Sequence, residues 1–121
     1  MIDYERIRET KIEDFIFIIY YIIITISIYS NMVEREYLKY HDNNLKEKYR
    51  SLLYIIYGIA FLVYLYYTIS SYKDYKSSTN YAEKRLKELS LIASILALIS
   101  GIIYLYIIYK DQDISVELAF N

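Results

Sequence analysis

The sequence predicts an all-α integral membrane protein with three transmembrane helices in a small up-down-up bundle. Charged residues make up 24% of the 121 residues, yet none lies in residues 15–33, 51–72 or 89–109. These segments hold 19, 22 and 21 residues, and a helix needs roughly 20 apolar residues to cross a hydrocarbon core about 30 Å thick. A chain of this length is expected to form a single domain over residues 1–121.

Each apolar segment is preceded by residues that favour a helix start. Thr10 and Glu13 have the spacing of a capping box, in which a hydroxyl and a carboxylate each accept a hydrogen bond from an orphan backbone N–H. Asn44 and Asn80 are each followed three residues later by a glutamate, and are expected to cap the second and third helices. These starts predict helices over residues 10–40, 44–76 and 80–110.

The two connections are short and polar. Residues 41–44 and 77–80 consist of His, Asp, Asn, Ser and Thr; most of these side chains compete for backbone hydrogen bonds and therefore favour turns. The flanking helices are longer than a hydrocarbon core is thick, so the hairpins are expected to extend beyond it. At one such end the spacing predicts two ion pairs one helical turn apart, Glu83 with Lys87 and Lys84 with Glu88.

Three crossings would place the termini on opposite sides of the membrane. Lys and Arg near the apolar segments number eight on the side of the N-terminus and six on the other side, and basic flanks favour the cytoplasm. The total favours a cytoplasmic N-terminus in a protein of the cell membrane. The charges around the first helix alone favour the reverse, so both orientations stay open.

Small residues recur on the third segment. Ala93, Ala97 and Gly101 are four residues apart, with Ser90 and Ser94 close by. Small residues at this spacing let two helix backbones approach closely inside a membrane, so they predict a helix-packing face. The neighbour is either another helix of this chain or another subunit, and the alternative is that small residues are simply tolerated there.

The second segment is rich in tyrosine, and two of its tyrosines are deep. Tyr57 and Tyr64 lie three or four residues from its centre, hence about 5–6 Å from the midplane at 1.5 Å per residue. An unpaired phenol at that depth costs on the order of 1–3 kcal/mol. Their hydroxyls are therefore expected to face protein, at backbone carbonyls or at Thr25, Ser27 or Ser94.

The first segment carries one mildly polar line. Tyr21, Thr25 and Tyr29 recur every four residues among isoleucines, so they share one face of a helix. This line is expected to dock against the tyrosine-rich second helix, which would then be central to the bundle.

No pattern of residues in the chain predicts chemistry. The sequence has no cysteine, a single histidine (His41) and only two glycines, which excludes cysteine metal sites and a glycine-rich phosphate loop. The apolar segments contain no ionisable Asp, Glu, Lys, Arg or His, the usual mark of ion paths and proton relays. A non-enzymatic protein is expected, with no catalytic residue, cofactor, metal or small-molecule substrate, and the net charge of −1 gives no footprint for nucleic acid.

A short tail, residues 111–121, follows the third segment. Its large apolar residues alternate with other residues, at Ile114, Val116, Leu118 and Phe120, which is the period of a half-buried strand. A lone strand is not stable, so the pattern predicts docking onto an edge in this chain or in a partner. A frayed tail and a segment lying at the membrane interface are the alternatives.

These patterns favour a non-enzymatic accessory or assembly subunit of a larger membrane protein complex. Deep tyrosines, a small-residue face and a docking tail all call for protein partners as well as a lipid bilayer. The alternative is a homo-oligomeric pore or membrane-permeabilising protein of the holin or effector sort, because small size and absence of chemistry fit it equally. A structural protein packed densely in a membrane is a third hypothesis.

Overall fold

The chain forms three long helices in the computed structural model, which describes residues 2–111. They are α1 (Tyr4–Tyr40), α2 (Asn43–Ser77) and α3 (Tyr81–Lys110). All three are long and apolar enough to cross a membrane. The expected all-α fold with three such helices is therefore confirmed for the described residues.

Helix α1 begins earlier than the sequence predicted. The Asp3 carboxylate accepts a hydrogen bond from the backbone N–H of Arg6 at 3.1 Å and caps the helix. The Arg6 guanidinium then pairs with Glu9 and Glu13 at 3.3 and 3.4 Å. The expected start at Thr10 is wrong because this earlier cap and its ion pairs support the added turns. Thr10 lies inside the helix and donates its hydroxyl to the Ile7 carbonyl.

The connection from α1 to α2 occupies two residues. His41 adopts the left-handed conformation (φ 52°, ψ 37°) and donates its backbone N–H to the Tyr37 carbonyl, which ends α1. Asp42 then caps α2 by accepting from the Asn44 N–H at 2.9 Å. The cap expected at Asn44 is therefore supplied by Asp42, because α2 starts earlier, at Asn43, and the Asp42 carboxylate reaches an orphan N–H of that first turn.

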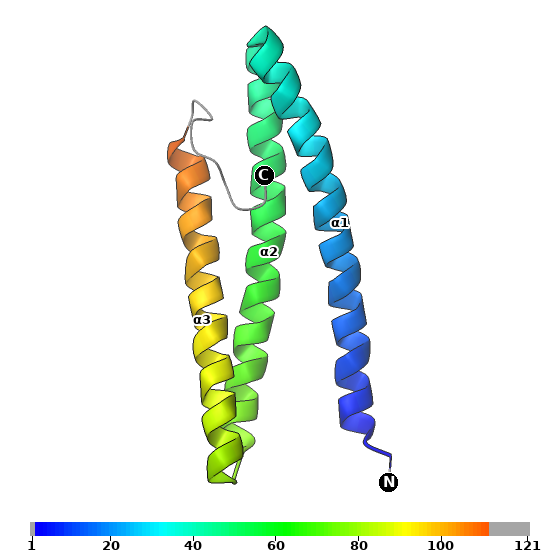
Figure 1. Cartoon of the computed structure of the whole chain (residues 1–121), viewed down its shortest axis with the longest axis vertical. Helices are drawn as coiled ribbons and strands as arrows, with labels where there is room; N and C mark the ends of the chain where they lie inside the picture. Colours follow the sequence, from blue (N-terminus) through cyan, green and yellow to red (C-terminus); the bar gives the residue numbers. More distant parts are fainter. Residues whose placement is uncertain (1, 112–121) are drawn as a thin grey trace.

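The cap expected at Asn80 is confirmed. Its side-chain oxygen accepts from the backbone N–H groups of Ala82 and Glu83, so α3 starts one residue later, at Tyr81. The α1–α2 connection lies at one end of the molecule, and the α2–α3 connection and the N-terminus lie at the other (Figure 1).

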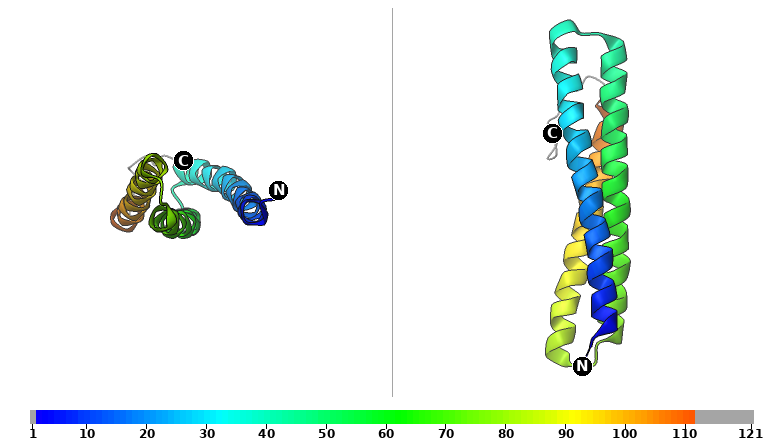
Figure 2. Two further views of the ribbon diagram at one scale, coloured as in Figure 1. Left: turned by 90° about the horizontal axis from the view of Figure 1, so that it is seen from below. Right: turned by 90° about the vertical axis from the view of Figure 1, so that its right-hand side faces the viewer.

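Helix α2 lies between the other two. It contacts both α1 and α3, whereas α1 and α3 make no contact with each other within the described residues. Seen along their length, the three helices form an open arc with α2 at its apex (Figure 2). Helix α1 also diverges from α2 toward the N-terminus (Figure 1).

The arc follows from two lines of residues along α2, one contacting α1 and one contacting α3, which are offset by one residue. Arg50, Tyr57, Tyr64 and Ser71 all meet α3. One residue earlier, Tyr49 is hydrogen-bonded to Glu34 of α1 and Val63 lines a hollow shared with α1, while Ile56 is buried between them in sequence. One residue is a rotation of about 100° in a helix of 3.6 residues per turn. Two helices held at 8–10 Å from α2 and about 100° apart lie roughly 14 Å from each other, too far for direct packing.

Two of the three best-buried side chains of the described residues lie on the first half of α2, and the third is Ser30 of α1. Ile56 and Tyr57 are 0% and 1% exposed, and they form one cluster with Ile23 and Val33 of α1 and Ile108 of α3. The molecule is therefore held most firmly near the α1–α2 connection, and more loosely toward the N-terminus.

Candidate functional site

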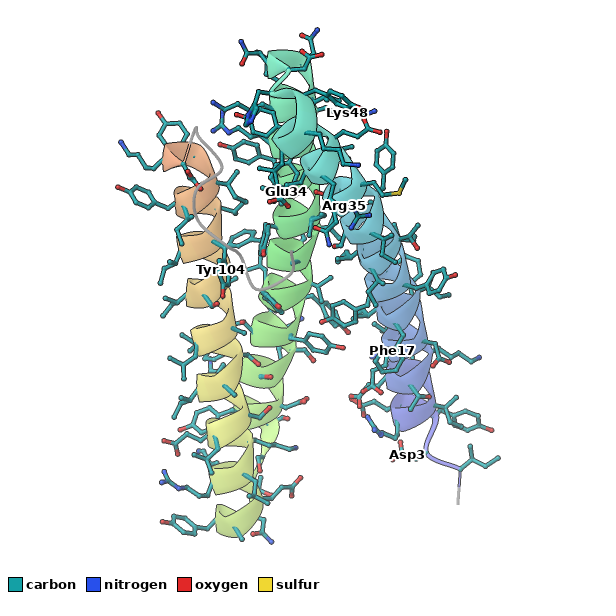
Figure 3. The ribbon with its side chains drawn as sticks, turned by 45° about the horizontal axis from the view of Figure 1, so that its top comes forward. Asp3, Phe17, Glu34, Arg35, Lys48 and Tyr104 are labelled. Carbon is teal, nitrogen blue, oxygen red and sulfur yellow. The ribbon has the colours of Figure 1, made fainter. Side chains whose placement is uncertain are left out.

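The α2–α3 contact is a ladder of four pairs with a seven-residue step on α2. Tyr57 packs its ring against Tyr104, with centroids 5.3 Å apart, and Tyr104 projects from α3 toward α2 (Figure 3). A Cβ added at Gly101 would lie 3.5 Å from the Tyr64 ring. Glycine here lets a large aromatic ring lie against the backbone of α3, which is how small residues support close helix packing.

The small-residue face expected on α3 is divided between two directions. Gly101 is buried against Tyr64, and Ser94 and Ala97 are half-buried. Ser94 also meets Ser71 of α2, with 3.2 Å between the two hydroxyl oxygens. Ser90 and Ala93 are exposed. Part of the expected face thus packs on α2, and part is open to whatever surrounds the protein.

The two deep tyrosines both lie at protein contacts. Tyr57 is almost fully buried, and Tyr64 is half-buried against Gly101. The hydroxyls expected to pair with these tyrosines each donate to a backbone carbonyl four residues earlier on their own helix. Thr25 donates to the carbonyl of Tyr21, Ser27 to that of Ile23 and Ser94 to that of Ser90. A hydroxyl that donates to the carbonyl one turn earlier is satisfied without any partner from another helix.

The polar line of α1 is exposed. Tyr21 is 71% exposed, and Thr25 and Tyr29 are exposed as well. Helix α1 packs on α2 through Ile16, Ile23 and Val33 instead. Of the line, only Tyr29 has a described contact with α2, where Lys48 lies 4.9 Å from its ring centre, because the burial of isoleucine side chains on a neighbouring face of α1 sets the rotation of the helix. The central position expected for the second helix is nevertheless seen.

A polar cluster missed by the sequence analysis lies near the carboxyl end of α3. The Arg50 guanidinium donates to the Ile108 carbonyl at 2.8 Å and to the Tyr109 carbonyl at 3.4 Å. A cation at this position satisfies carbonyls that have no partner within the helix and opposes the negative end of the helix dipole. The signal in the sequence was the position of Arg50, directly beside the charge-free segment 51–72, but nothing there indicates which helix it reaches.

The same region joins α1 to α2 through a second polar contact. Tyr49 is buried, and its phenol is hydrogen-bonded to the Glu34 carboxylate of α1. Burial, followed by the charge and the hydrogen bond of Glu34, raises the pKa of Tyr49 well above its usual range. Figure 3 shows Glu34 where α1 and α2 come together. Tyr49, Arg50 and Glu34 thus tie all three helices together just outside the charge-free segments.

Lysines lean over tyrosines at both ends of the helices. Lys48 lies 4.9 Å from the Tyr29 ring centre, and Lys110 lies near the rings of Tyr106 and Tyr109. Lys84 lies 5.1 Å from Tyr75 at the opposite end. Tyrosine and lysine together are typical of the two interfaces of a membrane, where an amphipathic ring and a long cationic chain both reach water.

One of the two expected ion pairs forms, and the other is replaced. Lys87 and Glu83 approach to 3.0 Å. Glu88 pairs with Arg85 at 3.5 Å, and Lys84 lies over Tyr75 instead. The expected Lys84–Glu88 pair is therefore not seen, because an aromatic face on α2 and a second basic residue compete for the two partners.

The apolar tail residues Ile114, Val116, Leu118 and Phe120 lie outside the described residues. Within residues 2–111, no group of three His, Asp or Glu side chains is arranged to hold a metal ion. Comparisons of the chain with models of protein families, with curated proteins and with solved structures give no match. The exposed apolar faces of the three helices are therefore the candidate site, and their chemistry suits binding to other apolar molecules.

Proposed function

We propose that this chain is a non-enzymatic accessory or assembly subunit of a larger membrane protein complex. In this proposal its three helices cross the cell membrane in an up-down-up order, with the N-terminus in the cytoplasm and the tail on the other side. The open arc of helices is the observation that carries the proposal. Because α1 and α3 do not pack on each other, faces of both helices are left for the helices of a partner to contact.

The helices leave most of their apolar surface uncovered. Only 22%, 28% and 11% of the most apolar stretches of α1, α2 and α3 are buried inside the chain. Ser90 and Ala93 on α3 are exposed although their size suits close helix contact. In lipid, association of helices depends on close packing and not on hydrophobic burial, so exposed small residues mark the part of α3 best suited to a partner helix.

A homo-oligomeric pore is the second candidate. Tyr20 of α1 and Tyr64 and Tyr67 of α2 are half-buried inside the charge-free segments. Their phenols, with the serines and threonines of these segments, would supply the polar lining of a water-filled path if several copies assembled around them. These polar groups favour the pore hypothesis over a purely apolar packing protein.

The deciding experiment extracts the chain from its native membrane in mild detergent and measures the mass and subunit composition of the particle. A large particle with different, stoichiometric subunits supports the accessory role. A particle made only of this chain contradicts it. Leakage of a dye from liposomes containing the purified chain would then support the pore.

A pair of matched variants tests whether α3 carries the contact. Ala93→Leu fills the exposed small-residue face, whereas Ile99→Leu changes an exposed α3 residue while conserving its volume. We expect Ala93→Leu alone to reduce recovery in the particle, by tenfold or more. Equal recovery of the two variants would show that the partner contacts another surface.

Truncation after Asp113 tests the tail separately. If residues 114–121 dock onto a partner, the shortened chain should leave the particle during extraction while keeping its helix content by circular dichroism. Full occupancy of the truncated chain would exclude the tail as the docking element.

A further inference from the structure

Two hollows adjoin along one side of the α1–α2 pair. The first is apolar, holds about 370 Å³ and lies between residues 12–19 of α1 and residues 59–66 of α2. The second is polar, holds about 470 Å³ and lies closer to the N-terminus, between α1 and the last turns of α2. Ile12 and Tyr66 line both hollows, so the two form one groove with a charged end and an apolar end.

The groove arises because α1 diverges from α2 toward the N-terminus (Figure 1). Its charged end lies beside Lys73 and Asp74, which directly follow the charge-free segment of α2. Its apolar end lies beside Phe15 and Ile16, which begin the charge-free segment of α1. If the helices cross a membrane as proposed, the groove runs from the headgroup level into the hydrocarbon core.

Both signs of charge line the polar end. Its basic residues are Arg8 and Lys73, and its acidic residues are Glu5, Glu9 and Asp74. Glu9 pairs with Arg6. Within residues 2–111, the other four side chains take part in no hydrogen bond or ion pair. The hollow thus offers two cations and two carboxylates without an ion-pair partner around one space, and the charge of Asp74 also acts on Lys87 of α3.

We propose that this groove binds a single phospholipid with a phosphoethanolamine headgroup. Arg8 and Lys73 hold the phosphate by charge-assisted hydrogen bonds. The carboxylates of Glu5 and Asp74 accept hydrogen bonds from the primary ammonium. One acyl chain lies in the apolar hollow, where residues 59–66 of α2 rise about 10 Å at 1.5 Å per residue.

The mixture of charges selects the headgroup. A phosphocholine carries the same charges, but its quaternary nitrogen has no N–H to donate to a carboxylate. An anionic lipid brings a negative charge to a hollow whose lining has more acidic than basic residues. A primary ammonium next to a phosphate is the headgroup that satisfies both kinds of side chain.

The test purifies the full chain from membranes and loads it into nanodiscs containing equal amounts of phosphatidylethanolamine, phosphatidylcholine and phosphatidylglycerol. Native mass spectrometry after release into detergent then identifies the retained lipid. We expect one phosphatidylethanolamine per chain, retained at least tenfold over the other two lipids. Equal retention of the three lipids, or preferential retention of phosphatidylglycerol, would overturn the proposal.

Two pairs of variants locate the site. Arg8→Gln with Lys73→Gln should reduce retention tenfold, whereas Lys84→Gln with Arg85→Gln, equal in charge but outside the groove, should leave it unchanged. Leu62→Trp fills the apolar hollow, and Leu96→Trp is its control on α3, since the two leucines are 63% and 61% exposed. If each control loses the lipid as fully as its partner variant, the groove is not the site.

This inference rests on the proposed membrane placement, and the two can fail separately. Resistance of the chain to extraction from membranes by alkaline carbonate tests the placement alone. A chain that resists extraction but retains no preferred lipid contradicts the lipid site and leaves the placement intact.

Discussion

The two glycines of the chain provide a matched test of the α2–α3 contact. Both lie in helix interiors, at Gly58 of α2 and Gly101 of α3. A Cβ added at Gly101 would lie 3.5 Å and 3.8 Å from two atoms of the Tyr64 ring, whereas a Cβ at Gly58 would meet nothing within 4 Å. The same substitution at the two sites therefore differs only in what the new side chain meets.

The magnitude follows from these distances. A contact of 3.5 Å is ordinary for a methyl group, so Gly→Ala should be tolerated at both sites and should gain up to about 1 kcal/mol from helix propensity. Gly→Leu also raises the helix propensity by a similar amount at both sites, so the propensity contribution to the unfolding free energy cancels when the two variants are compared. At Gly101 the extra carbons of leucine are forced against Tyr64, and overpacking of this kind costs about 1–3 kcal/mol. We expect Gly101→Leu to be less stable than Gly58→Leu by that amount.

The assay is reversible unfolding by sodium dodecyl sulfate in mixed micelles, followed by far-ultraviolet circular dichroism. A double-mutant cycle identifies the partner, because Tyr64→Ala should remove most of the penalty of Gly101→Leu. Equal unfolding free energies for Gly58→Leu and Gly101→Leu would show that Tyr64 does not pack closely against Gly101. A penalty that persists in the Tyr64→Ala background would show that α3 packs on something other than the Tyr64 ring.

Three further predictions use the same assay. Arg50→Met should lower the free energy of unfolding by about 1.5–3 kcal/mol, because it removes a charge-assisted hydrogen bond to the Ile108 carbonyl; Arg85→Met, at an exposed ion pair, is the control and should change little. Ser30→Ala should not destabilise the protein, because the Ser30 hydroxyl is buried without a hydrogen-bond partner in the described residues; a large loss would reveal a partner. The raised pKa of Tyr49 means that the folded state favours the protonated phenol, so the unfolding free energy should include a contribution from Tyr49 that is constant below about pH 10, the ordinary tyrosine value, and that falls as the pH rises above it. Tyr49→Phe should flatten that slope, and an unchanged slope would assign it to other tyrosines.

Much of the helical organisation was readable from the sequence because it depends on local properties. Charge-free segments of 19, 22 and 21 residues located the helices, and Asn80 was read correctly as a cap because its side chain acts on residues two and three positions away. The start of α1 was misjudged because two local caps, Asp3 and Thr10, compete. Only the first is used, and Arg6 with its two glutamates extends the helix beyond the apolar pattern.

The rotation of each helix was less predictable. Tyr21 and Thr25 were expected to face α2 because they are polar, yet they are exposed. If the helices cross a membrane as proposed, lipid and protein around them are both apolar, so hydrophobicity does not mark the buried face of a helix as it does in water. The packing of Gly101 on a neighbouring helix was predictable from its small size, because only faces with small residues let two helix backbones approach closely.

Local patterns in the chain predict three long apolar helices, their polar ends and the small residues at helical spacing on α3. These features follow from interactions between residues a few positions apart. Packing between the helices sets three others: the faces of α2 that meet α1 and α3 are one residue apart, α1 and α3 do not meet, and Arg50 reaches the end of α3. These depend on contacts between residues up to about 60 positions apart, whose geometry no local pattern contains.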